Sequence, residues 1–359
     1  MTINFKYAIP HVVGRGAGLG NQLIPWARSF VVGTVLGART LTPAFGLNTR
    51  NYSRHFNTPK TDWLARRALQ VVLPRFEFTE QEFYKYGGDS LSDAVRQFGE
   101  NNGLNERSAW VVSTQGMWGG YRHVIEAREF VRSTLYLSQF AAQNLANIKL
   151  RLQPNLITVG MHVRLGDFKA AVDSNQYCGK FNVSLPLQWY INIAKSIVTQ
   201  LGDRVQFLVV SDGSAEQLAP LLNECNAVTT SDIPNSDVSD MLALSNVDLL
   251  VCSVSSYSAW AAFLSNTPYL WFEPNLQKLD GYYSIWGHES RQKQPEGYMQ
   301  RSIDLLVKGD TSASPRGWPI ALDGAVPTAV IEKIANQPAT YSLATDLVNY
   351  GVVQMKVAR

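Results

Sequence analysis

The sequence predicts an α/β protein with two domains, in which apolar parallel strands are covered by helices on both faces. Its 359 residues are enough for about two domains of ordinary size. Apolar segments of strand length alternate with segments of helical periodicity, which is typical of parallel sheets buried between helices. A polar junction at 153–155 separates an expected first domain at about 1–150 from a second at about 151–320. Residues 321–359 are expected to form terminal helices that pack back on these domains.

The first domain is expected to begin with a strand at Tyr7–Val13 and a glycine-dense loop at 14–20. A helix with apolar residues at helical spacing follows the loop and ends at Gly37. Asn21 can cap this helix through its side chain, and Pro25 is tolerable only in the first turn. The further elements predicted for this domain are a long loop at 42–60, helices near 90–99 and 122–149, and a strand at 110–113.

The second domain alternates regularly between strands and helices. Apolar strands are predicted at 156–164, 205–210, 226–229, 249–252 and 269–272. Helices are predicted at 187–201, 214–223, 237–246 and 256–265. Residues 274–320 are expected to be largely irregular, and helices at about 326–336 and 341–350 close the chain.

The composition excludes several classes of protein. With 45% hydrophobic and 17% charged residues, the chain is not a disordered, collagen-like or coiled-coil protein. No apolar run approaches the roughly 20 residues of a membrane-spanning helix, and no signal peptide is evident. Three cysteines without CxxC spacing are too few for a disulfide scaffold and make a zinc knuckle improbable. A cytoplasmic location is therefore expected.

Charge is distributed unevenly along the chain. Residues 1–61 contain seven Lys and Arg but no acid, and Asp62 is the first carboxylate. Such a segment is expected to attract an anion, which could belong to a phosphate, a nucleic acid or a membrane surface. A solvated basic face is the alternative. Nucleic acid is the weakest of these interpretations, because aromatic residues do not alternate with the basic ones.

Polar residues follow two of the predicted strands at their carboxyl ends, where open α/β sheets bind ligands. His162 and Arg164 share one face of their strand, and an arginine there can neutralise a phosphate. The alternative is a core histidine beside a structural pair of Arg164 and Asp167. After the next strand, Ser211 and Asp212 suit sugar hydroxyls or the donor edge of guanine, or else an N-cap of the following helix.

Two other segments open helices and can therefore hold phosphate through backbone N–H groups. The loop containing Gly18 and Gly20 is one of them, although it fits neither the dinucleotide fingerprint nor the P-loop. A tight structural turn is the alternative for this loop. The second segment, 253–258, contains four serines including Ser255 and Ser256. One serine would only cap a helix, whereas a cluster favours an anion site.

Taken together, these motifs resemble the bacterial-type α-1,2-fucosyltransferase family, within the α-1,2/α-1,6/protein O-fucosyltransferase superfamily. The matching segments occur in the family's order between about residues 7 and 272. They are Gly18-Leu19-Gly20-Asn21-Gln22, Gly116-Met117-Trp118-Gly119, His162-Val163-Arg164-Leu165-Gly166-Asp167-Phe168, Leu185–Tyr190, Val210-Ser211-Asp212, Asp240–Ser245 and Val254–Trp260. The chain departs from the family at Leu165, where a second arginine is usual, and at Val254, where asparagine is usual.

The resemblance implies a GT-B architecture of two Rossmann-like domains with the active site in the cleft between them. The implied reaction is inverting transfer of L-fucose from GDP-β-L-fucose to a hydroxyl of a glycan or small-molecule acceptor, with no cofactor and no metal. Arg164 would stabilise the leaving phosphate, and Asp167 is one possible base. The implied donor-binding residues are Gly18, Gly20, Asn21, Gln22, His162, Arg164, Ser211, Asp212, Asp240, Ser255 and Ser256. A same-fold transferase using another nucleotide sugar and a non-catalytic nucleotide- or glycan-binding module are the alternatives.

Overall fold

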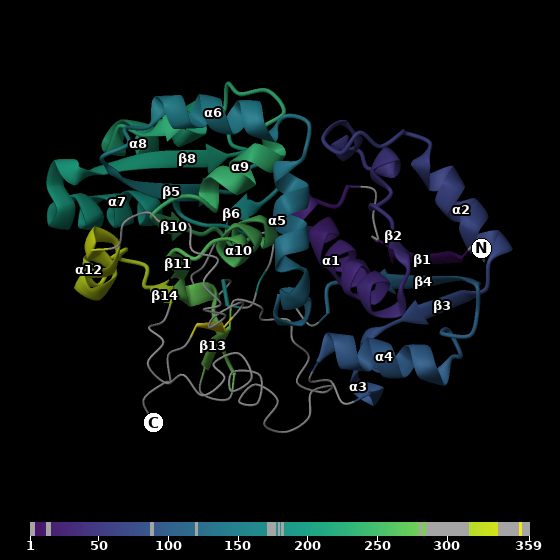
Figure 1. Ribbon diagram of the computed structural model, residues 1–359. Helices are drawn as coiled ribbons and strands as arrows, with labels where there is room; N and C mark the ends of the chain where they lie inside the picture. Colours follow the sequence, from purple (N-terminus) through teal and green to yellow (C-terminus); the bar gives the residue numbers. More distant parts are fainter. Residues whose placement is uncertain are drawn as a thin grey trace. The chain divides into compact units, whose positions relative to one another are not determined.

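The chain divides into two compact units, residues 1–139 and 140–359 (Figure 1). A computed structural model describes residues 4–11, 16–86, 90–118, 121–170, 177–178, 180, 183–279, 282–284, 316–336 and 352–353. The end of the first predicted strand at 12–13, the start of the glycine loop at 14–15 and the predicted helix at 341–350 lie outside the described residues.

The first unit is built on a four-stranded parallel sheet with the order β2-β1-β4-β3. Its strands are β1 (Phe5–His11), β2 (Arg39–Thr40), β3 (Arg75–Phe78) and β4 (Ala109–Gln115). Its helices are α1 (Leu19–Leu36), α2 (Asp62–Val72), α3 (Glu80–Lys85), α4 (Leu91–Asn101) and α5 (Arg128–Tyr136), with 3-10 turns η1 (Phe45–Leu47), η2 (Tyr52–Arg54) and η3 (Arg122–Ala127). Strands β2 and β3 and helices α2 and α3 had not been predicted.

Helix α1 joins the sheet to the rest of the first unit. Leu23, Ile24 and Ala27 are fully buried, and Ser29 Oγ lies 2.7 Å from Thr114 Oγ1 of β4. Trp26 makes edge-to-face contacts with aromatic rings outside the helix, namely those of Phe45, Phe56 and Phe130. This packing places the N-terminus of α1, and with it the glycine loop, at the carboxyl end of β1.

The predicted start of α1 was wrong, whereas its predicted end is confirmed. The helix begins at Leu19 after Gly18, so Asn21 lies inside the first turn and is not the N-cap. Pro25 is consequently in the helix interior, where it cannot donate the usual backbone hydrogen bond. Gly37 ends the helix with a φ of 63°, a left-handed conformation that glycine adopts without steric cost.

The second unit contains a six-stranded parallel sheet with the order β14-β11-β10-β5-β8-β9. Its strands are β5 (Ile157–Val163), β8 (Val205–Ser211), β9 (Val228–Thr229), β10 (Leu249–Val251), β11 (Tyr269–Phe272) and β14 (Gly317–Ile320). Counted along the chain and seen from the other edge, this is the order 3-2-1-4-5-6 of the Rossmann fold. The predicted class, an α/β protein with parallel sheets in two units, is confirmed.

Helices cover both faces of this sheet. They are α6 (Ala141–Arg151), α7 (Leu187–Leu201), α8 (Ala215–Cys225), α9 (Asp237–Leu244), α10 (Ser256–Leu264) and α12 (Thr328–Asn336). Val159 of β5 is buried in one core with Trp189 of α7 and Val330 of α12. On the opposite face, a Cβ at Gly160 would meet Leu244 of α9 at 3.0 Å, so glycine permits this close approach. The smaller elements are β6 (Lys169–Ala170), β7 (Val183–Ser184), β12 (Gln277–Leu279), β13 (Tyr282–Ser284), β15 (Val352–Val353), η5 (Gly202–Arg204) and η6 (Glu273–Asn275).

The units are divided about ten residues before the predicted junction, at 139/140. The predicted helix at 122–149 is in fact η3, α5 and α6, with a break between α5 and α6. Helix α6 belongs to the second unit because Asn144 donates to the carbonyls of Pro234 and Asn235, and Arg151 pairs with Asp232 at 2.6 Å.

The end of the predicted irregular region and the start of the predicted terminal part are built into the second unit. Strand β14 pairs with β11 along four residues, although 274–320 had been expected to be largely irregular. Helix α12 packs on α7. Residues 317–336 therefore complete the Rossmann-type unit.

Two sequence predictions concern membranes and disulfides. Among the described residues, no helix combines the length and the apolar character needed to cross a bilayer. Cys178, Cys225 and Cys252 are all free thiols.

Candidate active site

The predicted donor-binding residues of the second unit lie at the carboxyl edge of its sheet. From β5 the chain runs outward through β8 and β9 on one side, then returns to β10 and β11 on the other. The carboxyl ends of the adjacent strands β5 and β10 therefore mark the topological switch point of the sheet, which is the place where open α/β sheets bind ligands. His162 and Arg164 come from the end of β5, Asp212 follows β8, and the serine cluster follows β10.

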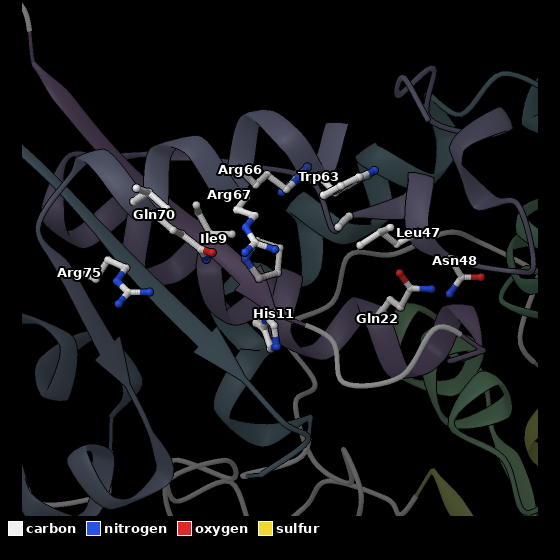
Figure 2. A pocket seen from close by; sticks show the side chains of 13 residues that line it. Ile9, His11, Gln22, Leu47, Asn48, Trp63, Arg66, Arg67, Gln70 and Arg75 are labelled. Carbon is white, nitrogen blue, oxygen red and sulfur yellow. The ribbon is translucent and has the colours of Figure 1, made fainter. Parts of the chain in front are cut away.

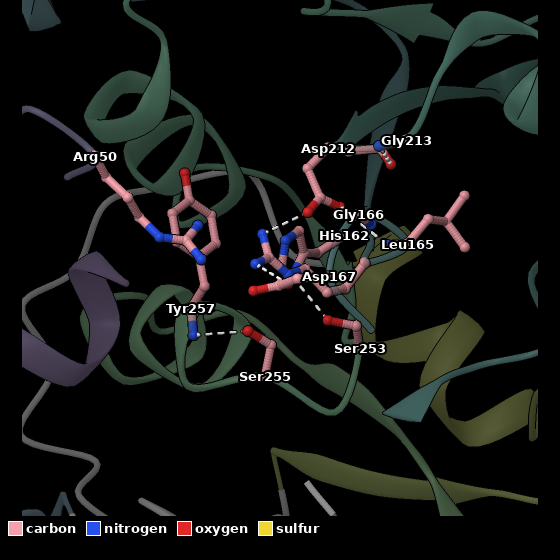
Figure 3. Close-up of polar contacts among 12 residues, drawn as sticks. Arg50, His162, Leu165, Gly166, Asp167, Asp212, Gly213, Ser253, Ser255 and Tyr257 are labelled. Carbon is pink, nitrogen blue, oxygen red and sulfur yellow. Dashed lines mark hydrogen bonds and ion pairs between the residues drawn. The ribbon is translucent and has the colours of Figure 1, made fainter. Parts of the chain in front are cut away.

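Arg164 is held by two carboxylates, which converge in Figure 3. Its Nη1 lies 2.7 Å from Asp212 Oδ2, and its Nη2 donates to Asp167 Oδ1 at 2.5 Å. The Nε atom of Arg164 is buried and has no hydrogen-bond partner among the described residues. Because a guanidinium has five N–H donors, these two contacts leave others for a ligand. The predicted pair of Arg164 and Asp167 is therefore present, and Arg164 still has N–H donors that a ligand could use.

Asp212 also closes the loop after β5. Its Oδ1 accepts from the backbone N–H groups of Leu165 at 2.9 Å and Gly166 at 3.1 Å. A Cβ at Gly166 would collide with the Asp212 carboxylate, which explains the glycine at this position. The N-cap interpretation of Ser211 and Asp212 was wrong, because Ser214 caps α8 in a reciprocal pair with Gln217. Both carboxylate oxygens of Asp212 already have partners within the protein, so contact between Asp212 and guanine stays a prediction.

His162 is a buried, neutral residue that positions the serine segment. Its ring is 4% exposed, and Nδ1 lies 2.6 Å from Ser258 Oγ and 2.9 Å from Ser253 Oγ. Burial, helped by the positive charge of Arg164, lowers the pKa of His162 to about 3. The imidazole ring also lies 4.9 Å from the ring of Tyr257. The sequence had singled out other serines of the cluster, and only the fold distinguishes Ser253 and Ser258 as the partners of His162.

The remaining serines open α10. Ser255 is the N-cap and accepts from the backbone N–H of Tyr257 at 3.2 Å (Figure 3). Ser256 is the first helical residue. The Tyr257 hydroxyl donates to the carbonyl of Asp237 at 2.5 Å, which ties the first turns of α9 and α10 together. The hydroxyl-rich helix terminus predicted from the sequence therefore lies beside the end of β10.

Asp240 lies beneath this edge of the sheet, in the first turn of α9. Its side chain is buried, and Oδ2 accepts from Ser236 Oγ at 2.7 Å. Burial raises the pKa of Asp240 to about 7. The structure thus places this predicted donor-binding residue in the packing below the site.

The glycine loop of the first unit is held by the segment predicted as a long loop. Gln22 and Asn48 both donate to the carbonyl of Ala17, at 3.1 and 2.9 Å, and Arg50 Nε donates to the carbonyl of Gly16 at 3.0 Å. Gly18, Gly20 and Asn21 form the start of α1, where Asn21 is exposed. Sequence reasoning had not singled out Asn48, and it had counted Arg50 only among the seven basic residues of segment 1–61; both lie in the predicted long loop at 42–60.

Arg28 is a second residue that sequence reasoning missed. It is fully buried and donates to the carbonyls of Gln115 at 3.0 Å and Trp118 at 2.6 Å. Its guanidinium lies 3.5 Å from the ring centre of Trp118. Burial lowers the pKa of Arg28 to about 9, which leaves it charged at neutral pH. Arg28 and Arg50 of the basic segment 1–61 therefore donate to backbone carbonyls, and the attraction of this segment for an anion stays a prediction.

Asp167 and Asp212, the carboxylates at the switch point, both form ion pairs with Arg164. Within the described part of the chain, no three His, Cys, Asp or Glu side chains gather as a metal-binding group. A divalent ion at this edge of the sheet would have to compete with the Arg164 guanidinium for both Asp167 and Asp212.

A Rossmann-type sheet with a guanidinium, hydroxyls and a helix N-terminus at its switch point is an arrangement in which open α/β proteins bind anionic ligands. The sequence profile of glycosyl transferase family 11 matches residues 105–271. The match covers just under half of the chain, and it bears out the predicted family resemblance and the prediction of a glycosyltransferase. The matched range contains the Arg164 cluster and the serine segment, whereas the glycine loop precedes it.

Two solved structures are similar to this chain. The fucosyltransferase NodZ from Bradyrhizobium is 14% identical, with 74% of this chain and 94% of that chain covered and a TM-score of 0.44. POFUT1 in complex with GDP-fucose is 12% identical, with 75% and 97% covered and a TM-score of 0.41. A comparison with curated protein sequences finds no match. Because both scores are low, the fold assignment rests on the strand order of the chain itself.

Proposed function

We propose that this glycosyltransferase moves L-fucose from GDP-β-L-fucose to a hydroxyl of a glycan or small-molecule acceptor, with inversion and without a metal. One observation carries the proposal: Arg164 stands at the switch point of a Rossmann-type sheet within the segment that matches the family. The assignment of fucose as the sugar and of guanine as the base rests on the fucosyltransferase motifs in the sequence. A cytoplasmic location remains a prediction from the sequence.

The hard step is departure of the β-phosphate from the anomeric carbon, because negative charge accumulates on that phosphate. A fixed guanidinium in a site sheltered from water stabilises this charge more than it stabilises the bound donor. Asp212 holds Arg164 in place and is itself anchored by two backbone N–H groups. Asp167 is 56% exposed and is therefore the partner that a phosphate can replace.

The start of α10 supplies the second group of donors. Backbone N–H groups at a helix N-terminus bind anions, and Ser255 and Ser256 add hydroxyls there. His162 keeps this segment in register through Ser253 and Ser258. Because the pKa of His162 is about 3, its role in the proposed reaction is to position these groups as a neutral ring, not to transfer protons.

Inversion requires the acceptor hydroxyl to attack from the face opposite the leaving phosphate, and a base speeds this attack. The sequence identified no base: Asp167 was one possible base, with an Arg-orienting or turn-capping role as the alternative, and its contact with Arg164 favours the orienting role. A transferase that uses another nucleotide sugar is the second candidate. The observation in its favour is that Asp212, the residue expected to bind guanine, is occupied by Arg164 and the backbone of 165–166.

Thermal unfolding in the presence of nucleotides tests the donor site. A ligand at about 100 times its Kd stabilises the folded protein by about 2.7 kcal/mol. GDP should raise the Tm more than UDP or ADP, and Arg164→Ala should remove the effect. Arg151→Ala is the matched control, since Arg151 lies in the same unit and forms a surface pair with Asp232. A larger shift with UDP would favour the second candidate, and no shift with any nucleotide would contradict both.

A further inference from the structure

A pocket of about 540 Å³ lies within the first unit, between α2 and the carboxyl end of β1 (Figure 2). This volume is within the range of roughly 300–1,000 Å³ that is typical of small-molecule sites. Gln22 lines the pocket and also donates to the carbonyl of Ala17. The pocket therefore adjoins the glycine loop, which carries a motif of the family.

Helix α2 turns an unusual face toward this pocket. Trp63, Arg66, Arg67 and Gln70 follow one another at helical spacing and all line it. Figure 2 shows Arg67 and Gln70 extending from the helix toward Ile9 and His11 of β1. A helix that only packs on a sheet presents apolar residues at such positions. Here the face is cationic and polar with one large aromatic ring, which suits a polar ligand.

Arg66 has buried donors that the protein does not use. Its side chain is nine-tenths buried, and Nη2 donates to Thr42 Oγ1 at 2.7 Å and pairs with Asp62 at 3.4 Å. Its Nε and Nη1 atoms are buried without a hydrogen-bond partner among the described residues. Leaving buried N–H donors unpaired is costly. Both atoms are inaccessible here, so an acceptor group in the pocket reaches them only if the Arg66 side chain reorients.

The charge of the pocket lining is positive, and only Arg66 of its three arginines has a carboxylate partner in the described ranges. The side chains of Arg67 and Arg75 make no ion pair and no hydrogen bond within the described ranges. His11 is the fourth basic residue of the lining, which contains no Asp or Glu. Guanidinium groups match the geometry of carboxylates and phosphates through paired N–H donors. The pocket thus selects an anion, and its size leaves space for more than the anionic group.

We propose that this pocket binds the acceptor, and that the acceptor is an acidic saccharide carrying a carboxylate or a phosphate. The arginines hold the anionic group, the indole of Trp63 packs against the apolar C–H face of a sugar ring, and Gln70 bonds to hydroxyls. This inference rests on the proposed transferase function only in calling the bound molecule the acceptor. The binding preference itself follows from the pocket.

The test is a ligand-observed NMR titration of the full chain with four probes: glucuronic acid, glucose 6-phosphate, glucose and inorganic phosphate. At least one acidic sugar should bind about tenfold more tightly than glucose and than inorganic phosphate. The sugar with the greater affinity identifies the anionic group as carboxylate or phosphate. Added salt should weaken the binding, because screening reduces charge attraction. Equal binding of glucose would overturn the proposal, and so would equal binding of inorganic phosphate.

Two arginine variants complete the design. The double variant Arg67→Ala, Arg75→Ala should weaken acidic-sugar binding about tenfold or more, with an unchanged Tm because both side chains are exposed. Arg96→Ala is the control, since Arg96 lies in the same unit and pairs with Asp93 outside the pocket. GDP binding is measured in parallel. Unchanged sugar binding in the double variant, or an equal loss of GDP binding, would overturn the proposal. Failure of the wild type to bind GDP would contradict the proposed function and leave the sugar result to be judged separately.

Discussion

Replacing Asp240 by Asn should change how the stability of the protein depends on pH. The Asp240 carboxyl is buried in the first turn of α9, and its Oδ1 has no hydrogen-bond partner in the described structure. Burial disfavours the charged form, so the pKa of Asp240 rises from 3.8 to about 7. Asn has the same shape and does not ionise. The Ser236 hydroxyl, which donates to Asp240 at 2.7 Å, can donate to the amide oxygen instead.

The sign and size of the effect follow from linkage. A carboxyl with a raised pKa in the folded state binds its proton more tightly there, so folded stability falls as pH rises from 3.8 toward 7. One unit of pKa corresponds to about 1.4 kcal/mol, which makes the complete loss about 4 kcal/mol. Between pH 5 and pH 8 the loss is about 2 to 3 kcal/mol. The Asn variant should therefore gain this amount relative to wild type over that interval.

The assay is urea unfolding of wild type and Asp240→Asn at several pH values from 5 to 8. The two proteins must be compared, because His162 acts in the opposite direction. Its pKa of about 3 makes wild-type stability fall as pH decreases from 6.5 toward 3, which masks Asp240 in wild type alone. Asp232→Asn is the control, since Arg151 lowers the pKa of this carboxyl and keeps its titration below the tested interval. A constant difference between Asp240→Asn and wild type across this interval would refute the reasoning.

Three further predictions concern the Arg164 cluster. Arg164→Lys should bind GDP almost as weakly as Arg164→Ala, because an ammonium cannot replace a fork of N–H donors; calorimetry showing wild-type affinity would contradict this. Asp167→Asn should bind GDP as tightly as wild type or more tightly, because removing the carboxylate frees Arg164, whereas weaker binding would assign Asp167 a direct role. Transfer should survive millimolar EDTA, because Arg164 already occupies Asp167 and Asp212; activity that is lost and then restored by Mg²⁺ or Mn²⁺ would show that the phosphate site has been misinterpreted.

Much of the second unit could be predicted from the sequence, because its strands are buried on both faces and form clear apolar runs. The ends of these runs then located His162, Arg164 and Asp212 at one edge of the sheet. The partners could not be predicted in the same way. Asp212 meets the loop at 165–166 across 46 to 47 residues of sequence, and only the parallel pairing of β5 with β8 brings them together.

The first unit was harder to predict for a related reason. Helix α2 was missed although its sequence is amphipathic; its polar and charged face lines the pocket, whereas Leu64 and Val72 of the same helix are exposed. Strands β2 and β3 contain two and four residues, which is too short for an alternating pattern. The basic segment 1–61 predicted an anion site, which stays a prediction, and two of its arginines, Arg28 and Arg50, bond to backbone carbonyls. The pocket instead takes its arginines from the residues that follow that segment.

The most direct test of the central claim is transfer from GDP-β-L-fucose to a panel of neutral and acidic saccharides in EDTA, followed by NMR of the product. Inverting transfer through a site organised by Arg164 predicts that an α-L-fucoside and GDP form together. It also predicts that Arg164→Ala loses this activity while Arg151→Ala keeps it. A β-fucoside product, or turnover with a UDP-sugar and none with GDP-fucose, would contradict the account.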